Sequence, residues 1–296
     1  MLEVVSPGVF YGFAMAFGLV VGSFLNVVIY RLPRGESIVH PGSHCPNCDA
    51  PVKPWDNLPV VSYLLLRGRC RTCGQHIALR YPAVELGNGL LFAALAWQFG
   101  PSWMALLFMG LVAALWVAAL VDLDHQIIPD SISLGGAVVG LVFMPLVAAH
   151  SGTSYGESLL TSLLGAVVGG GTLWSIAFLH ARLSVALGRQ FSHWPGEGES
   201  PPGPRDADYW LWFPGLGLGD VKLLAMVGTF LGPLGVLDTI VAASVLGLVS
   251  GLAWAALKRD WSSPFGFGPA IAAGALCSIF SPLHLLILSG ARASLA

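Results

Sequence analysis

Two aspartates of the sequence lie at the ends of long apolar segments. Asp122 follows the uncharged stretch 102–121, and Asp220 closes the sequence Gly217-Leu-Gly219-Asp220 in front of another apolar stretch. Charged side chains at membrane depth are costly and usually serve a function. Two carboxyl groups that share a proton can hydrolyse an amide bond, because one activates a water molecule while the other polarises the carbonyl group. The pattern therefore predicts aspartic peptidase chemistry, which needs no metal.

Neighbouring aspartates offer alternatives to this pair. Asp124 lies two residues after Asp122, about 200° around a helix, so the two side chains would point in opposite directions. Asp130 is separated from Asp122 by Pro129, which ends one helix or begins the next. Asp122 and Asp220, which belong to different apolar segments, are therefore the natural pair. The alternative interpretation is that these aspartates cap helices or lie at helix ends.

The residues around Asp220 agree with a peptidase site. Gly217 and Gly219 carry no side chain, so a substrate backbone could approach the carboxylate closely. Lys222 would place a positive charge beside the same site. The motif Gly-x-Gly-Asp is weak by itself, and it gains weight only if Asp122 and Asp220 lie on one side of the membrane.

Four of the five cysteines form the pattern C-x2-C-x21-C-x2-C, with Cys45, Cys48, Cys70 and Cys73. Two thiolate pairs from two tight turns can close a tetrahedral zinc site, and Gly74 after the second pair suits such a turn. Four cysteine ligands leave no open position, so the spacing predicts a structural rather than a catalytic zinc. Disulfides or free thiols are the alternative, which a reducing compartment would disfavour.

The composition identifies the kind of protein that holds these residues. The chain has 296 residues, of which 55% are hydrophobic and only 10% are charged. Soluble domains contain about 25% charged residues, so a soluble globular enzyme is excluded, and so is a disordered chain. With 14 Lys and Arg against 16 Asp and Glu, no excess of basic residues points to nucleic acid. We therefore expect an all-α polytopic membrane protein in a lipid bilayer.

Hydrophobic stretches predict about eight transmembrane helices. Each must cross about 30 Å of hydrocarbon, which takes about 20 apolar residues. The predicted spans are about 8–30, 83–99, 102–121, 131–149, 157–180, 220–234, 236–257 and 268–289.

Basic residues predict the orientation of these spans, since they collect in cytoplasmic loops. Of the 14 Lys and Arg, Arg292 alone lies on the other side and Lys222 lies just beyond a cytoplasmic loop. The other 12 fall in the predicted cytoplasmic loops 31–82, 122–130, 181–219 and 258–267. This orientation places both termini in the periplasm, and Asp122 and Asp220 at the cytoplasmic face.

The expected domain organisation follows from these loops. Residues 1–30 form the first transmembrane helix, and 31–82 form a small cytoplasmic zinc-binding segment between helices 1 and 2. About 50 residues bury too little apolar surface to fold securely without such a metal. Residues 83–296 form the membrane peptidase core of seven helices, and its cytoplasmic loop 181–219 has the Pro/Gly/acidic composition of a linker.

At this point the motifs match a known family over nearly the whole chain. The sequence resembles the type IV prepilin leader peptidases, also called prepilin peptidase/N-methyltransferases, which are GxGD-type aspartic peptidases of bacterial inner membranes. Residues 189–219 have no functional match, and the last motif stands within PFGFGPA rather than the more usual PFGP. The matching stretches are Gly22–Pro33, the CPNC and CRTC pairs, Arg80–Leu86, Asp122–Asp130, Gly217–Lys222 and Phe267–Pro269.

The resemblance implies a function with two reactions. Asp122 and Asp220 would be the catalytic aspartates. The substrates would be prepilins and pseudopilins, whose short basic leader is cleaved after a Gly on the cytoplasmic side of the inner membrane. The new N-terminal residue would then be N-methylated with S-adenosylmethionine, since family members with the cysteine segment generally carry out both reactions.

Residues for the methyl transfer are harder to identify. The sequence contains no Gly-rich nucleotide loop after a strand. Glu85, at a cytoplasmic span end, could hold the new α-amino group, or it could pair with Arg80 or another cytoplasmic arginine. Asn26, in the first span, could contribute to the same site or could form a hydrogen bond between helices.

Two other classes of function compete with the enzyme. A transporter would use intramembrane Asp and Lys to carry protons or ions, but it should place them near the midplane rather than at span ends. A non-enzymatic assembly protein would use the zinc segment for docking and would have no need of two aspartates at one membrane depth. The enzyme is the preferred interpretation.

Overall fold

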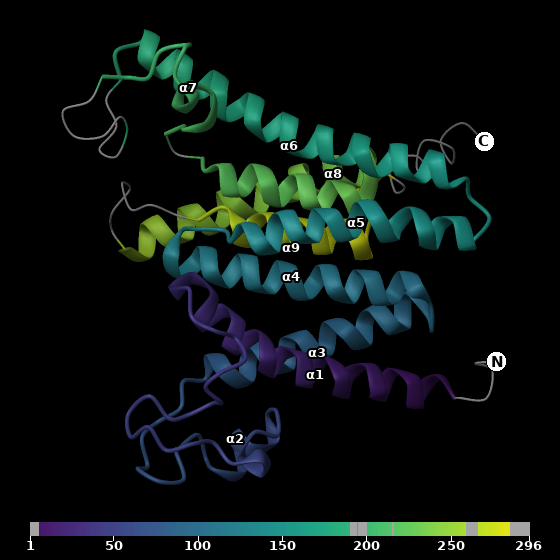
Figure 1. Cartoon of the computed structure of the whole chain (residues 1–296), viewed down its shortest axis with the longest axis vertical. Helices are drawn as coiled ribbons and strands as arrows, with labels where there is room; N and C mark the ends of the chain where they lie inside the picture. The colour runs from purple at the N-terminus through teal and green to yellow at the C-terminus, as the bar shows by residue number, and fades with distance from the viewer. Residues whose placement is uncertain (1–5, 190–193, 195–199, 215, 259–265, 285–296) are drawn as a thin grey trace. The chain divides into compact units, whose positions relative to one another are not determined.

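The computed structural model describes residues 6–189, 194, 200–214, 216–258 and 266–284 (Figure 1). Over these residues the chain is helical and has only isolated β-bridges. It divides into two compact units, Met1–Val121 and Asp122–Ala296. The helical elements are α1 (Pro7–Arg31), η1 (Leu32–Arg34), η2 (Pro54–Asp56), α2 (Val61–Leu65), α3 (Arg80–Phe99), α4 (Trp103–His125), α5 (Asp130–His150), α6 (Tyr155–Ala186), α7 (Ala207–Leu211), α8 (Leu218–Lys258) and α9 (Gly268–Phe280).

Five helical stretches are long and apolar enough to cross a membrane, which confirms a multi-pass helical protein. The 20-residue α3 is not among them, and α9 is a shorter apolar helix. The last predicted span ends with residues 285–289, which lie outside the described residues. Both termini of the chain also lie outside them. The five stretches are Pro7–Arg34, Trp103–His125, Asp130–His150, Tyr155–Ala186 and Leu218–Leu257.

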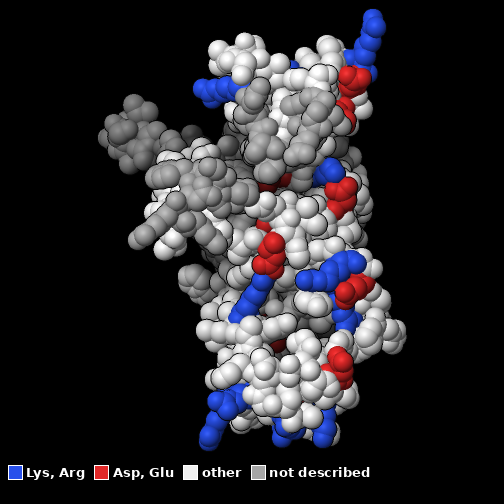
Figure 2. Space-filling model, turned by 90° about the vertical axis from the view of Figure 1, so that its left-hand side faces the viewer, with Lys and Arg blue, Asp and Glu red and all other residues white. Residues whose placement is uncertain are grey.

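The surface agrees with this assignment. Large apolar side chains are exposed along α1, for example Val9 and Phe13, where lipid rather than water would cover them. Figure 2 shows basic and acidic side chains interspersed on one face, with uncharged residues covering most of the described surface between them.

The long helix α8 folds back on itself. Gly232 has φ 68° and ψ −177°, outside the helical region, and Pro233 follows it. A methyl group added at Gly169 of α6 would lie 2.5 Å from the carbonyl oxygen of Leu224 and 2.8 Å from Cγ2 of Val236. Residues 12 apart would be separated by about 18 Å in an unbroken helix. The two halves of α8 are therefore antiparallel, and they coincide with the predicted spans 220–234 and 236–257.

α9 packs against the returning half of α8 in the opposite direction. Gly247 approaches the ring of Phe267, and Gly274 lies against the carbonyl oxygen of Thr239. Residue numbers thus rise along α9 as they fall along α8. As a result, the beginning of α9 lies at the same end of this unit as the beginning of α8.

Small residues bring the helices of the second unit close together. A methyl group at Gly165 of α6 would lie 2.0 Å from the carbonyl oxygen of Gly228 in α8, so the two backbones are in direct contact. Gly140 of α5 similarly receives Thr229 of α8, whose Oγ1 would lie 2.0 Å from an added methyl group. In lipid, where helices gain little from the hydrophobic effect, such close approach supplies the packing energy. Figure 1 shows α5, α6, α8 and α9 side by side.

The first unit uses the same kind of contact between α1 and α3. Gly18 of α1 lies against Gly89, and Gly22 lies against the backbone of Glu85. The side-chain amide of Asn88 donates to the carbonyl oxygen of Gly18 at 2.7 Å. The helices are antiparallel, so the end of α1 and the beginning of α3 flank the cysteine-bearing segment (Figure 1).

Candidate active site and metal-binding cluster

Asp122 lies in the last turn of α4 and is only 5% exposed. Its Oδ2 accepts a hydrogen bond from the backbone N–H of Gly268, the first residue of α9, at 2.8 Å. The first N–H groups of a helix have no partner within the helix, and a carboxylate there also meets the positive end of the helix dipole. This carboxylate therefore joins the end of α4 to the beginning of α9.

Asp220 lies in the first turn of α8 and is 9% exposed. Its Oδ1 is buried and has no hydrogen-bond partner among the described residues. The charge of Asp122 acts on Asp220, so the two carboxylates lie within electrostatic reach of each other. A buried polar atom without a partner is uncommon and is a feature of functional sites. The two aspartates that the sequence pairs are thus both buried and within electrostatic reach of each other.

Gly266 and Gly268 lie directly against Asp122. The sequence motifs around the aspartates did not point to these two glycines. A methyl group at Gly266 would lie 2.3 Å from Oδ2 of Asp122, and one at Gly268 would lie 2.8 Å from it. Any side chain at either position would displace the carboxylate. In the sequence, Gly268 lies within the motif Phe267-Gly-Pro269 and Gly266 lies just before it, and this motif was noted only through the family resemblance.

The glycines before Asp220 have different surroundings. The backbone of Gly217 is hydrogen-bonded to the carboxylate of Asp220, and a methyl group at Gly217 would lie 3.9 Å from its Oδ2, in ordinary contact. A methyl group at Gly219 would instead lie 3.1 Å from Cβ of Ile128. Gly217 thus helps to hold the Asp220 carboxylate, whereas Gly219 allows close packing on Ile128.

The other charged residues near this end of the unit are arranged differently. Asp124 is exposed, unlike Asp122. Lys222 binds Oδ1 of Asp130 at 2.7 Å, and both side chains are partly exposed, at 31% and 59%. The positive charge expected beside Asp220 is thus held by Asp130, at the beginning of α5.

The four cysteines predicted to bind metal converge on one point. The sulfur atoms of Cys45, Cys48, Cys70 and Cys73 all lie within 4.8 Å of one another. The sulfurs of Cys45 and Cys73 are 3.8 Å apart. Sulfur ligands about 2.3 Å from a tetrahedral metal ion are separated by about 3.8 Å. The donor set and its spacing therefore suit a metal ion.

Each cysteine pair lies in a similar turn. The N–H of Cys45 donates to Ala50, and the N–H of Cys70 donates to Gln75 in the equivalent position. The residue after each pair, Asp49 or Gly74, has a positive φ of 53° or 71°. The backbone N–H of Gln75 lowers the pKa of the Cys73 thiol to about 6, which favours the thiolate that binds metal.

An ion pair joins the two halves of the cysteine segment. Arg71 donates to both carboxylate oxygens of Asp56, at 2.8 and 2.5 Å. The hydrogen bond from Arg71 holds the pKa of Asp56 below its usual range. The turn that holds the second cysteine pair is thus tied to η2.

The two methyl-transfer candidates bind neighbouring parts of the first unit. Oε2 of Glu85 accepts the backbone N–H of Val60 at 2.7 Å, and the same carboxylate is hydrogen-bonded to Ser23. The amide of Asn26 donates to the carbonyl oxygen of Tyr81 at 3.1 Å, which is a bond between α1 and α3. One of the two predictions for Asn26, a hydrogen bond between helices, is therefore confirmed.

Comparisons with known proteins add to this geometry. Residues 16–99 match the family model "Bacterial Peptidase A24 N-terminal domain", and residues 106–252 match "Type IV leader peptidase family". A prepilin leader peptidase/N-methyltransferase of Stutzerimonas stutzeri is 34% identical over 90% of this chain and 89% of its own length. The chain belongs to the type IV leader peptidase family. Proteins with the same name from Neisseria gonorrhoeae and Pseudomonas aeruginosa are also 34% identical, over 87% and 86% of this chain and 86% and 84% of their own lengths.

The two family matches separate the candidate sites. The A24 N-terminal match covers the four cysteines, Asn26 and Glu85, and the leader peptidase match covers Asp122 and Asp220. The structure divides the chain close to the same point, between Val121 and Asp122. No solved structure matches this member of the leader peptidase family.

Proposed function

We propose that this protein removes the leader peptide of type IV prepilins and pseudopilins and then N-methylates the new N-terminus. The observation that carries the peptidase half is that two buried carboxylates, Asp122 and Asp220, at the ends of two membrane helices lie within electrostatic reach of each other. The family supports both halves, since its named relatives are prepilin leader peptidase/N-methyltransferases along nearly the whole chain.

In the proposed cleavage, Asp122 and Asp220 share one proton. The ionised carboxylate takes a proton from water as the water oxygen bonds to the carbonyl carbon. The protonated carboxyl group meanwhile donates to the carbonyl oxygen. When the C–N bond breaks, the leaving nitrogen takes a proton from a carboxyl group. The Oδ1 atom of Asp220, which has no hydrogen-bond partner among the described residues, supports this role, because it is available to water or to a peptide carbonyl group.

The proposed topology places this reaction at the cytoplasmic face of the bacterial inner membrane. It consists of eight spans with both termini in the periplasm. The distribution of 14 Lys and Arg supports it, and so does the fold-back of α8 into two spans. A prepilin is a basic leader followed by an apolar helix, so its helix would lie in the bilayer while its leader reaches the aspartates from the cytoplasm.

We propose that the four cysteines hold a structural zinc ion. Their number, their spacing and the 3.8 Å sulfur–sulfur distance support zinc, which prefers four thiolates in a tetrahedron. Bound zinc would fix the two turns against each other and leave no position for a substrate. Its contribution is thus to the folding of residues 31–82.

For the methyl transfer we propose S-adenosylmethionine as donor. When bound, S-adenosylmethionine would supply an electrophilic methyl group to the lone pair of the new α-amino group; its sulfur would leave as a neutral thioether, and the methylated amine would release one proton to water. Glu85 is proposed to hold the amino group, and its place in the A24 N-terminal match supports this. Asn26 contributes to the same site by joining α1 to α3.

The test uses purified protein in detergent, a prepilin with its leader, and intact mass as the readout. Wild-type protein should remove the leader, and should add one methyl group when S-adenosylmethionine is present. Asp122→Asn and Asp220→Asn should remove no leader, because either change destroys the shared-proton pair. Asp124→Asn is the matched control and should cleave like wild type. Cleavage by either of the first two variants would show that another residue is catalytic.

A further inference from the structure

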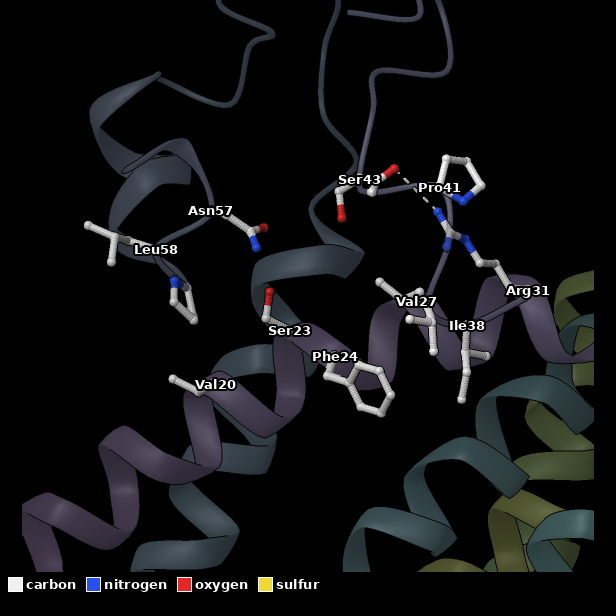
Figure 3. Close-up of a pocket in the computed structure, with 13 residues that line it drawn as sticks. Val20, Ser23, Phe24, Val27, Arg31, Ile38, Pro41, Ser43, Asn57 and Leu58 are labelled. Carbon is white, nitrogen blue, oxygen red and sulfur yellow. Dashed lines mark hydrogen bonds between the residues drawn. The ribbon is translucent and has the colours of Figure 1, made fainter. Parts of the chain in front are cut away.

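A cavity of about 390 Å³ lies in the first unit, between α1 and two loops of the cysteine segment. Sites for small molecules usually enclose about 300–1,000 Å³. Figure 3 shows Val20, Ser23, Phe24 and Arg31 of α1 along one wall, with Ser43 and Asn57 from the loops opposite. All residues that line the cavity belong to the first unit, and neither Asp122 nor Asp220 is among them. The proposed cleavage assigns no role to this cavity.

One end of the cavity carries a buried cation. Arg31 is only 7% exposed, and its guanidinium group donates to the carbonyl oxygens of Ser37 at 3.0 Å and Gly42 at 3.5 Å. These bonds hold the side chain in the cavity wall near Pro41 and Ser43 (Figure 3). A guanidinium group has five N–H donors in a fork that suits a carboxylate. This end would therefore bind the carboxylate of a ligand.

Another part of the wall favours positive charge. Ser23 lines the cavity and is hydrogen-bonded to the carboxylate of Glu85, which thus lies one side chain behind the wall. Pro59, next to the Val60 whose N–H binds the same carboxylate, also lines the cavity. Phe24 adds an aromatic ring, whose face attracts cations and stacks with planar rings. A ligand with a cationic centre and a flat ring would suit this part.

We propose that this cavity binds the methyl donor, with the amino-acid carboxylate of S-adenosylmethionine at Arg31 and its sulfonium centre near Phe24 and Ser23. The donor carries a carboxylate, a cationic sulfur and a flat base in one molecule, which are the three features that the wall offers. The inference rests on the proposed function and adds where the donor binds. It also explains why Glu85, beside this wall, would be well placed to hold the amine that receives the methyl group.

The test measures equilibrium binding of radiolabelled S-adenosylmethionine to the purified full-length protein in detergent. Val20→Trp would fill the cavity from α1 and should weaken binding by at least about tenfold. Val9→Trp is the matched control, because Val9 is equally exposed on α1 but does not line the cavity. Phe24→Ala and Phe13→Ala form a second pair, in which only the first should weaken binding. Thermal unfolding of each variant shows whether it is folded.

A second readout locates the donor directly. Ultraviolet cross-linking of the labelled donor should mark peptides that contain residues 20–31, 38–43 or 57–59. Binding that Val20→Trp and Phe24→Ala leave unchanged, or a label confined to other peptides, would overturn the assignment. A wild-type protein that binds no S-adenosylmethionine would also overturn the assignment. A lipid headgroup in the cavity would give this result.

Leader cleavage by the same wild-type preparation separates the two proposals. Cleavage and methylation together with a label elsewhere would refute the cavity assignment alone and leave the proposed function standing. A folded wild type that neither cleaves nor methylates several prepilins would refute the proposed function itself.

Discussion

The two central carboxylates differ in what holds them. Asp122 is fixed by the N–H of Gly268 and crowded by two glycines, whereas Asp220 has an oxygen with no partner among the described residues. A fixed group beside an open one suits a site that must admit water and a peptide carbonyl. The sequence predicts the pairing of Asp122 with Asp220, because helical geometry excludes Asp124 and the predicted orientation places both at one face; the electrostatic reach between the two carboxylates agrees with this prediction. The role of Gly266 could not be predicted, since no local pattern shows that a loop 144 residues later touches Asp122.

Gly266→Ala provides a test at this scale. The new methyl group would lie 2.3 Å from Oδ2 of Asp122 and must displace the carboxylate. A shift of about 1 Å in a catalytic group can cost about 100-fold in rate, so the kcat of leader cleavage should fall by up to that factor. The matched control is Gly110→Ala in α4, where an added methyl group meets nothing within 4 Å. Equal cleavage rates for the two variants would show that Asp122 is not held as described.

At the scale of helices, the packing of the second unit depends on glycines that bring the backbones of neighbouring helices into contact. Apolar length predicts the five long apolar helices, and it predicts a break in α8 at residue 235, three residues after the non-helical Gly232. It does not predict which glycines form the crossings, because Gly165 and Gly171 both lie among small and apolar residues of the same helix, α6. Only the partner helix distinguishes them: Gly165 meets Gly228, whereas an atom added at Gly171 meets nothing.

This difference gives a prediction about stability. Gly165→Leu should force α6 and α8 apart and lower the free energy of unfolding by about 1–3 kcal/mol or more, as overpacking does. Gly171→Leu, on the same helix, should leave it nearly unchanged. Thermal unfolding in detergent measures both. A melting temperature for Gly165→Leu at or above that of Gly171→Leu would contradict the close crossing.

At the scale of the whole molecule, the chain separates into two units whose boundary follows the two family matches. The cysteine spacing predicts the convergence of Cys45, Cys48, Cys70 and Cys73, because two C-x2-C turns of this kind are typical of residues that share one metal ion. The cavity beside this cluster could not be predicted, since its wall combines residues of α1 with two loops that have no regular structure. Hydropathy identifies α1 as a membrane span but does not show that Ser23 and Arg31 face a cavity.

Metal removal tests the first unit. Purified protein should contain about one zinc ion per chain, and a strong chelator should make residues 31–82 sensitive to protease, because the segment is too small to fold without the ion. Cys45→Ser should lose the zinc, whereas Cys277→Ser, outside the cluster, should retain it. Elemental analysis measures the metal. Full protease resistance after complete chelation would show that the segment does not need the ion.

The fold-back of α8 also bears on how the protein is made. Between Lys222 and Asp238 the chain carries no charged residue, and the turn at Gly232 and Pro233 lies within this stretch. Moving a charge through the hydrocarbon during insertion costs several kcal/mol, about 2.5–3.5 for Arg, Lys or Asp at the centre of a helix. In the proposed orientation, the inserting hairpin would carry only the charge of Asp238, six residues after Gly232, across the bilayer, while Asp220 and Lys222 would stay on the side where synthesis occurs. The uncharged turn would thus let the nascent chain leave Asp220 at the face where, in the proposed function, the leader peptide is cut.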